Sequence, residues 1–162
     1  MERQIRLLIV DDEERFLKTL AERLKLRDFD VTAVTNGQEA LAAARGKEFD
    51  LALIDLKMPG MSGEQLLEEL RRAHPTIEVI ILTGHGSVDS AVHCMRSGSY
   101  HYLQKPCGTN DLLEVLKNAY RARVQRKLRL DEARMESLLK AVQGESPLAI
   151  LRRLRTMDGE GT

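Results

Sequence analysis

The sequence predicts an α/β protein, built as a doubly wound parallel sheet of five strands with helices on both faces. Three observations carry this prediction. Apolar segments of five or six residues recur along the chain, segments with apolar residues at helical spacing lie between them, and the connecting loops are short. Strands that alternate with helices form parallel sheets, because each helix returns the chain across one face of the sheet.

The first two strands and helices are expected between residues 5 and 46. A mostly apolar strand, Ile5–Val10, precedes a helix whose apolar residues recur every three or four positions as far as Lys25. A second strand, Val31–Thr35, precedes a helix that Asn36 caps and Gly46 ends. Asn accepts hydrogen bonds from the first turn of a helix, and Gly is favoured after the last turn.

The other elements continue the alternation. We expect strands at Leu51–Asp55, Val79–Thr83 and Tyr100–Gln104, and helices that begin at Ser62, Ser87 and near Thr109. Ser62 and Gln65 have the spacing of a capping box, and His74-Pro75 ends that helix. The helix that begins near Thr109 has no stop signal before Gly144, which corresponds to about 50 Å of continuous helix.

Length and composition suit one compact domain with an extension. The chain has 162 residues, of which 43% are hydrophobic and 31% charged, and its formal net charge is +0. Residues 1–120 sum to −4 and residues 121–162 to +4, so the body is acidic and the tail basic. No apolar run reaches the roughly 18 residues of a membrane span, no signal peptide follows Met1, and Cys94 and Cys107 are expected as free thiols. We therefore expect a cytoplasmic protein.

Polar residues stand at the ends of four predicted strands. In a five-stranded sheet of order 2-1-3-4-5, strands one and three end side by side at the edge where such sheets bind ligands. Asp11 and Asp12 follow the first strand and Asp55 ends the third. Thr83 and Lys105 come at the ends of the next two strands. This order predicts that all five residues line one rim.

Three crowded carboxylates repel one another, and a divalent cation is the simplest way to keep all three ionised. Oxygen ligands without His or Cys favour a hard ion, so we expect Mg²⁺, with Mn²⁺ as a second candidate. Asp55 would then attack a phosphoryl group whose charge the Lys105 ammonium neutralises and to which the Thr83 hydroxyl donates. Each residue alone also has a structural explanation: a helix cap for Asp11 and Asp12, a turn for Asp55 and Thr83, and a solvated charge for Lys105.

The motifs around these residues resemble the receiver domain of two-component response regulators. The resemblance covers about residues 4–122 and rests on segments at the family's spacing, which are Val10-Asp-Asp-Glu13, Asp55-Leu-Lys-Met-Pro-Gly60 with Gly63, Thr83-Gly84 and Tyr102-Leu-Gln-Lys-Pro106. It implies a flavodoxin-like fold, a Mg²⁺ site, and an aspartate phosphorylated by a partner histidine kinase or phosphotransfer protein.

The resemblance assigns a role to eight positions. They are Asp55 as phospho-acceptor, Asp12 as direct metal ligand, Asp11 as a ligand acting largely through water, the backbone carbonyl of Lys57 as a further ligand, Thr83 as switch hydroxyl, Tyr102 as switch aromatic, Lys105 as the invariant lysine and Pro106 as the cis-proline. Inward and outward positions of Tyr102 would expose different surfaces on the fourth helix, fifth strand and fifth helix.

Within this family, residues 80–106 look like the receivers of enhancer-binding regulators that work with the alternative sigma factor. Those regulators continue into an ATPase domain and a DNA-binding domain. No Gly-x-x-x-x-Gly-Lys-Ser/Thr phosphate loop occurs here, and the residues after the receiver are too few for either module. The chain is therefore expected to signal to a downstream protein by contact, without turning over an external substrate and without binding DNA directly.

Three other functions fit part of the pattern. A haloacid-dehalogenase-type phosphatase needs a second Asp two residues after the nucleophile, where this chain has Lys57. A flavin-nucleotide binder needs a Ser/Thr/Gly-rich loop after the first strand, where Asp11-Asp-Glu-Glu14 would repel a phosphate. A pseudo-receiver scaffold has no need of the acceptor residues, all of which are present.

The sequence predicts three segments: a receiver domain at 1–122, a helical extension at 123–143, and a short amphipathic helix with a frayed end at 144–162. The extension has an apolar line at coiled-coil spacing, interrupted once by Asp131. The line runs through Leu113, Leu116, Tyr120, Val124, Leu128, Met135, Leu138 and Val142. We expect a homodimer through this helix and the face of the fourth helix, fifth strand and fifth helix. A helix that bends back onto its own receiver is the alternative.

Charges and capping residues complete the prediction for the tail. A basic run is expected to face solvent, with contact to an acidic partner as the alternative, namely Arg121, Arg123, Arg126, Lys127 and Arg129. Ser146-Pro147 starts the last helix, in which Leu148, Leu151 and Leu154 share one side. That helix would clasp the long helix, dock on a partner, or do little, and residues 158–162 are expected to fray.

Overall fold

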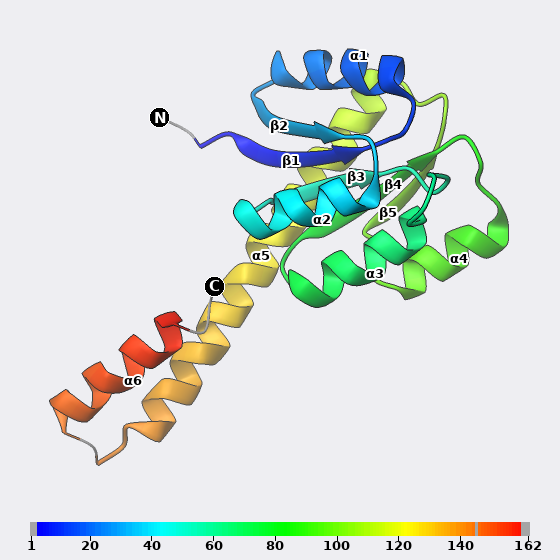
Figure 1. Ribbon diagram of the computed structural model, residues 1–162. Helices are drawn as coiled ribbons and strands as arrows, with labels where there is room; N and C mark the ends of the chain where they lie inside the picture. The colour runs from blue at the N-terminus through cyan, green and yellow to red at the C-terminus, as the bar shows by residue number, and fades with distance from the viewer. Residues whose placement is uncertain (1–2, 145, 160–162) are drawn as a thin grey trace. The chain divides into compact units, whose positions relative to one another are not determined.

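The computed structural model describes residues 3–144 and 146–159. It confirms the predicted fold, a five-stranded parallel sheet in the order β2-β1-β3-β4-β5 with helices between the strands (Figure 1). The elements are β1 (Ile5–Val10), α1 (Glu14–Lys25), β2 (Phe29–Val34), α2 (Gly37–Gly46), β3 (Leu51–Ile54), α3 (Gly63–Ala73), β4 (Glu78–Thr83), α4 (Val88–Arg96), β5 (His101–Gln104), α5 (Thr109–Ala141) and α6 (Pro147–Gly159).

The register of the sheet brings the carboxyl ends of β1 and β3 together. Val10 pairs with Val34 of β2 on one side and with Ile54 of β3 on the other. The ladder continues past both strand ends, because the Asp11 amide donates to the Val34 carbonyl at 3.2 Å and the Asp55 amide to the Val10 carbonyl at 3.0 Å. Residues that follow β1 and β3 therefore start from neighbouring points on one edge.

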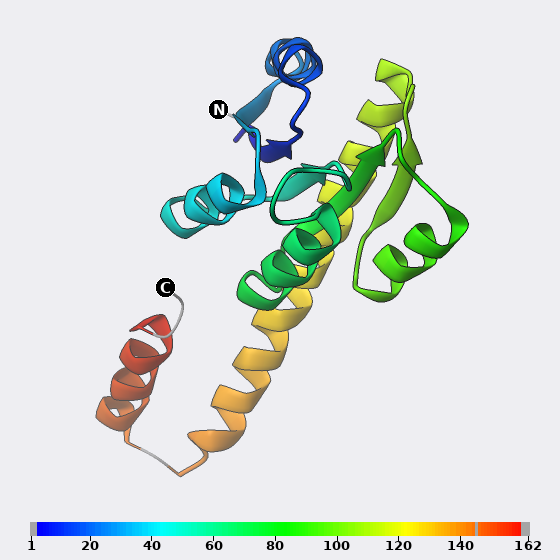
Figure 2. The ribbon, with the colours of Figure 1, turned by 45° about the vertical axis from the view of Figure 1, so that its right-hand side comes forward.

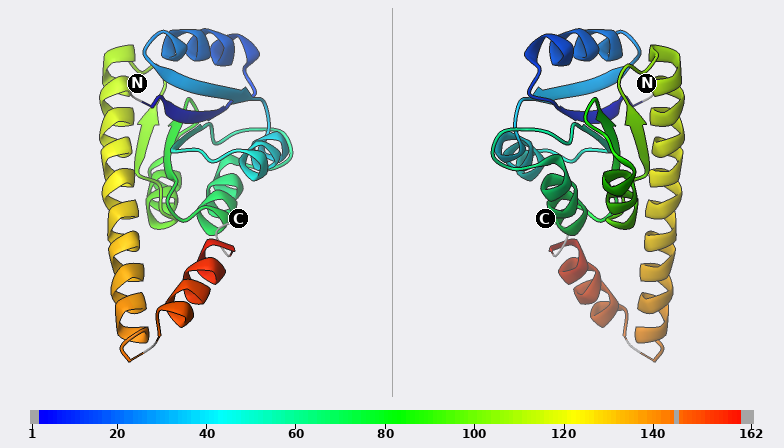
Figure 3. Two further views of the ribbon diagram at one scale, coloured as in Figure 1. Left: turned by 90° about the vertical axis from the view of Figure 1, so that its left-hand side faces the viewer. Right: turned by 90° about the vertical axis from the view of Figure 1, so that its right-hand side faces the viewer.

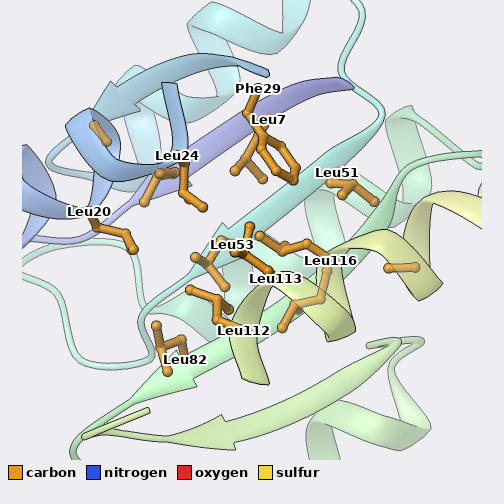
Figure 4. Packing of buried hydrophobic residues seen from close by; sticks show 14 of the residues in the cluster. Leu7, Leu20, Leu24, Phe29, Leu51, Leu53, Leu82, Leu112, Leu113 and Leu116 are labelled. Carbon is orange, nitrogen blue, oxygen red and sulfur yellow. The ribbon is translucent and has the colours of Figure 1, made fainter. Parts of the chain in front are cut away.

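The central strands are buried on both faces of the sheet, so their side chains pack alternately into two hydrophobic cores. On one face Leu7, Leu53 and Leu82 pack with residues of α1 and α5, including Leu24 and Leu116 (Figure 4). On the other face the alternate residues, such as Leu8 and Ile54, pack with α2, α3 and α4. Figures 2 and 3 show the first turns of α5 and helix α3 on opposite sides of the sheet. Each fully buried Leu contributes about 1.5–3 kcal/mol of hydrophobic stabilisation.

Local hydrogen bonds place the helix starts where the sequence predicted them. Asn36 Oδ1 accepts from the Glu39 amide at 2.9 Å, and Ser62 and Gln65 form a complete capping box. Ser87 caps α4 through the Ser90 amide. These bonds satisfy amides that the first helical turn leaves without a partner.

Strand β2 begins two residues earlier than predicted, at Phe29 instead of Val31. Asp is disfavoured in strands, so Asp30 by itself gives no local sign of one. In the fold Asp30 pairs with Lys47 at 2.8 Å, and the turn before it uses Asp28 in the left-handed region at φ 68°. A partner distant in sequence thus stabilises a residue that its local propensity disfavours.

The chain divides into two compact units, Met1–Val124 and Gln125–Thr162. Helix α5 is one uninterrupted helix, as predicted, and ends shortly before Gly144, whose φ is +88°. Ser146 caps α6 by accepting from the Ala149 amide at 3.3 Å. Helix α6 continues to Gly159, a residue type common at helix ends, and so includes the first two residues of the segment that is expected to fray. Residues 160–162 lie outside the described part of the chain.

No helix within residues 3–144 and 146–159 combines the length and apolar character that a membrane span requires.

Candidate functional site

Three carboxylates from two neighbouring strands meet at the carboxyl edge of the sheet. Oxygen atoms of Asp11, Asp12 and Asp55 lie within 4.8 Å of one another. Asp11 and Asp55 are each 2% exposed, whereas Asp12 faces solvent. The cluster therefore has one accessible carboxylate and two that the fold has taken out of water.

Glycine at position 63 allows α3 to begin directly against the chain that follows β3. A Cβ atom at Gly63 would overlap the backbone carbonyl of Asp55 and the Cα of Leu56. The Gly63 amide donates to the Leu56 carbonyl at 2.8 Å, which closes the turn that contains Pro59 and Gly60. This contact fixes the backbone of Asp55 from the helix side, while the β1 ladder fixes it from the sheet side.

Lys105 supplies the positive charge of the site. Its Nζ lies 2.7 Å from Asp11 Oδ2, 3.9 Å from Asp55 Oδ2 and 3.7 Å from Glu13 Oε1. The same ammonium sits 4.1 Å from the centre of the Phe16 ring, a cation–π distance. The peptide bond from Lys105 to Pro106 is cis.

Burial and the neighbouring charges shift the pKa values of Asp11 and Lys105 in opposite directions. Burial raises the pKa of the Asp11 carboxyl, and the hydrogen bonds from Lys105 and from the Glu13 amide only partly offset that rise. Burial alone lowers the pKa of the Lys105 ammonium, but the hydrogen bond to Asp11 and the charges of Asp11, Asp55 and Glu13 outweigh it, so its pKa is raised. The single lysine remains cationic at neutral pH among four acidic side chains.

The second carboxylate oxygen of Asp55, Oδ1, indicates whether the site suits a metal ion. Asp55 Oδ1 is buried and accepts no hydrogen bond from the residues that the structure describes. A buried carboxylate oxygen without a donor costs free energy, and a hard cation held by oxygen ligands satisfies it. The residues present therefore fit Mg²⁺. An open depression of about 560 Å³, lined by Asp12, Lys57 and His85 among others, lies beside the cluster.

Two further predicted residues occupy the next strands of the sheet. Thr83 is fully buried at the end of β4, and its Oγ1 accepts from the His85 amide at 3.1 Å. Tyr102 in β5 is half-buried, and its hydroxyl shares a hydrogen bond of 2.9 Å with Ser90 Oγ on α4. A side chain at Gly86 would meet the Tyr102 hydroxyl, so glycine leaves room for the ring under the β4–α4 loop.

A second cluster of charges lies at the opposite edge of the sheet, where the strands begin. Asp50, 2% exposed, accepts from the Arg6 amide at 2.8 Å and from the Arg6 guanidinium at 3.1 and 3.3 Å. Arg123 of α5, 4% exposed, contacts the same carboxylate at 3.1 Å and Glu48 at 2.8 Å. The prediction that the basic run faces solvent is wrong for Arg123, because this guanidinium has two acidic partners beneath it.

Sequence reasoning also missed Phe16 and Ser90. Phe16 follows the apolar spacing of the first helix, which predicts a place in the core. Ser90 stands three residues after Ser87 and forms the capping box of α4 with it, which does not point to Tyr102. The role of each residue depends on a contact with a residue much further along the chain, which is Lys105 for Phe16 and Tyr102 for Ser90.

Comparisons with known proteins agree with this geometry. The family model of the response regulator receiver domain matches residues 7–117. The chain is 35% identical over 111 residues to the DNA-binding transcriptional regulator NtrC of Salmonella typhimurium, which covers 68% of this chain and 24% of NtrC. It is 37% identical over 116 residues to the transcriptional regulatory protein ZraR of Klebsiella oxytoca, which covers 72% of this chain and 26% of ZraR. The chain thus spans about a quarter of the length of these curated relatives.

Solved structures show the same fold. A CheY-like response regulator receiver domain protein from Methanospirillum hungatei superposes with a TM-score of 0.74 at 32% identity, covering 76% of this chain and 98% of that one. The solution structure of the beryllofluoride-activated NtrC4 receiver domain dimer gives a TM-score of 0.70 at 30% identity, covering 73% and 98%.

Proposed function

This chain belongs to the receiver domain family of two-component response regulators, and on that premise we propose that it accepts a phosphoryl group on Asp55 from a sensor histidine kinase or a phosphotransfer protein. Receiver domains are signalling domains, and the matched part of the chain is similar to the receivers of enhancer-binding regulators. The observation that carries the proposal is the position of Asp55, which lies between two acidic side chains and one lysine at the ligand-binding edge of the sheet.

The reaction is a transfer between a nitrogen and an oxygen. An Asp55 carboxylate oxygen forms the new bond to phosphorus as the bond from phosphorus to the donor's imidazole nitrogen breaks, and the nitrogen keeps the electron pair. Lys105, already 3.9 Å from Asp55, can follow the negative charge that spreads over the phosphoryl oxygens. Thr83, at the end of the neighbouring strand, donates its hydroxyl to one of those oxygens.

Asp11, Asp12, Asp55 and the backbone carbonyl of Lys57 would hold the metal ion, which we propose to be Mg²⁺, with Mn²⁺ as a substitute. When bound, the ion neutralises phosphoryl charge and relieves the repulsion between the carboxylates. The exposed side chain of Asp12 leaves this side of the site open to an ion from solvent.

Phosphorylation would switch the surface formed by α4, β5 and α5. An aspartyl phosphate adds about two negative charges near Thr83, and the hydroxyl that turns toward them leaves space for Tyr102. The hydrogen bond between the hydroxyl groups of Tyr102 and Ser90 links that ring to α4, so a movement of the ring changes the α4 surface as well. A downstream protein would bind one of the two states.

We assign three roles along the chain. Residues 1–122 act as the receiver, residues 123–143 as an extension that supports a homodimer together with the α4–β5–α5 face, and residues 144–162 as a short helical tail. The exposed apolar residues Val124, Leu128 and Met135 support the dimer.

We place the protein in the cytoplasm, where its two cysteines, both free in the structure, stay reduced. We propose no turnover of an external substrate, because Lys57 stands where a haloacid-dehalogenase-type phosphatase needs a second Asp as general acid.

Intact mass spectrometry tests the proposal. With Mg²⁺ and acetyl phosphate, the mass of the chain is expected to rise by about 80 Da, and the gain should disappear with EDTA or with Asp55→Asn. Asp89→Asn, at an exposed position on α4, is the matched control and should leave the gain intact. If no donor and no histidine kinase adds a phosphoryl group, the chain is an unphosphorylated scaffold and the proposal fails.

A further inference from the structure

The second unit of the chain, Gln125–Thr162, exposes an unusual number of large apolar side chains. On α5 they are Leu128 (56% exposed), Leu130 (41%), Met135 (55%) and Leu139 (59%), and on α6 they are Leu148 (62%), Leu151 (56%) and Leu154 (39%). Side chains of this kind are exposed singly on most proteins, but a contiguous set marks an interaction surface.

Except for Leu130, which lies about 200° around α5 from Leu128, these side chains form one stripe on each helix. Leu148, Leu151 and Leu154 recur every three residues along one side of α6, and Leu128 and Met135 stand one heptad apart on α5. The half-buried apolar residues of the unit lie next to the loop, namely Leu138, Val142, Ala149 and Ile150. Among residues 125–144 and 146–156, contact within one chain therefore covers the apolar residues at the loop end of the two helices.

Helix α6 is too short to be stable by itself. It has 13 residues, near the lower limit at which isolated helices of even the best sequences are marginal in water. Its stability must come from packing of its apolar side, yet Leu148, Leu151 and Leu154 are exposed in a single chain. A second surface has to cover it.

The chain carries the complementary surface itself. The segment 131–136 of α5 contains Asp131, Glu132 and Glu136 against one basic residue, Arg134, while α6 contains Arg152, Arg153 and Arg155 and no acidic residue before Asp158. α6 turns back from the end of α5 (Figures 1 and 3).

We propose that this unit is a self-association module in which the helix pairs of two copies form a four-helix bundle. Each α5 packs between its own α6 and the α6 of the partner subunit, which brings the Leu148, Leu151 and Leu154 stripe of each α6 onto the apolar line of the other chain's α5. Short-looped helix pairs commonly bury their apolar sides in this way. The proposal rests on the homodimer proposed above and adds that α6 is required and that phosphorylation is not.

Light scattering coupled to size exclusion, on the full chain without any phosphoryl donor, tests the module. The expected mass is about twice the 18.3 kDa of one chain. Leu151→Glu on the apolar side of α6 should weaken the dimer at least about tenfold in dissociation constant. Thr156→Glu places the same charge on the other side of α6 and should leave the constant within about twofold.

A chain that ends at residue 143 separates this proposal from the homodimer. It keeps the whole of α5 and lacks α6, and it should be a monomer. A dimer that persists in this shortened chain overturns the role of α6 while the homodimer stands. A full chain that is monomeric overturns both, and one that dimerises only after phosphorylation overturns the independence from phosphate.

Discussion

The buried charge cluster at the amino edge of the sheet makes a quantitative prediction. Replacing Arg123 by Met keeps a long side chain in place but removes the guanidinium from Asp50 and Glu48. Breaking a buried ion pair by removing one partner usually costs about 3–5 kcal/mol, because the other charge stays buried. Here Asp50 retains three hydrogen bonds from Arg6, and Glu48, half-exposed, can turn to water. We therefore expect a loss of about 2–3 kcal/mol.

That loss corresponds to a fall of roughly 5–10 °C in the midpoint of thermal unfolding for a chain of this length. Circular dichroism at 222 nm follows the unfolding transition, because the chain contains no tryptophan whose fluorescence could report it. Arg129→Met is the matched control, since Arg129 is exposed on the same helix, and it should change stability by less than about 0.5 kcal/mol. Asp50→Asn should be at least as damaging as Arg123→Met, because it leaves two guanidinium groups without their shared carboxylate.

Equal midpoints for Arg123→Met and Arg129→Met would refute the reasoning. They would mean that the cost of dehydrating the guanidinium cancels its attraction to Asp50, which is the known outcome for some buried ion pairs.

Three other predictions follow from close contacts. Gly63→Ala should destabilise the protein by about 1–3 kcal/mol in urea unfolding, because the added methyl group overlaps backbone that cannot move aside. A double-mutant cycle of Tyr102→Phe and Ser90→Ala should give a coupling energy of about 0.5–1.5 kcal/mol, and additive effects would exclude the bond. At pH 8 iodoacetamide should label the native chain once, at the half-buried Cys107, and denatured chain twice. Burial raises the pKa of both thiols, but that of the fully buried Cys94 rises to about 11, which leaves about 0.1% of it as thiolate.

Local signals explain what the sequence predicted well. The capping box of Ser62 and Gln65 lies within one helical turn, so the residues themselves specify it. The site was predictable for a related reason. Once the strand order is known, Asp11, Asp12 and Asp55 must meet, because they follow strands that are neighbours in that order.

Long-range contacts explain what was missed. Arg123 and Glu48 are 75 residues apart, and nothing near Arg123 in the sequence distinguishes it from the solvated arginines around it. Its burial depends on the packing of α5 over the edge of the sheet. The early start of β2 is a similar case, since Asp30 lies in the strand beside Lys47, a residue 17 positions along the chain. Helical spacing likewise placed Phe16 in the core but could not show that its ring would lie under the Lys105 ammonium.

The end of the receiver can be located by the same argument. Arg123 is the last buried residue of α5, and the exposed apolar line begins at Val124. A chain that ends at residue 122, the boundary expected from the sequence, loses the contact with Asp50 together with the tail. A chain that ends at Gln125 loses only the tail. We expect the thermal midpoint of the longer fragment to lie near that of the full chain in its monomeric form. The midpoint of the shorter fragment should be about 5–10 °C lower, the same loss as for Arg123→Met. If the two fragments unfold together, the boundary at 122 is correct and the contact of Arg123 with Asp50 does not stabilise the receiver.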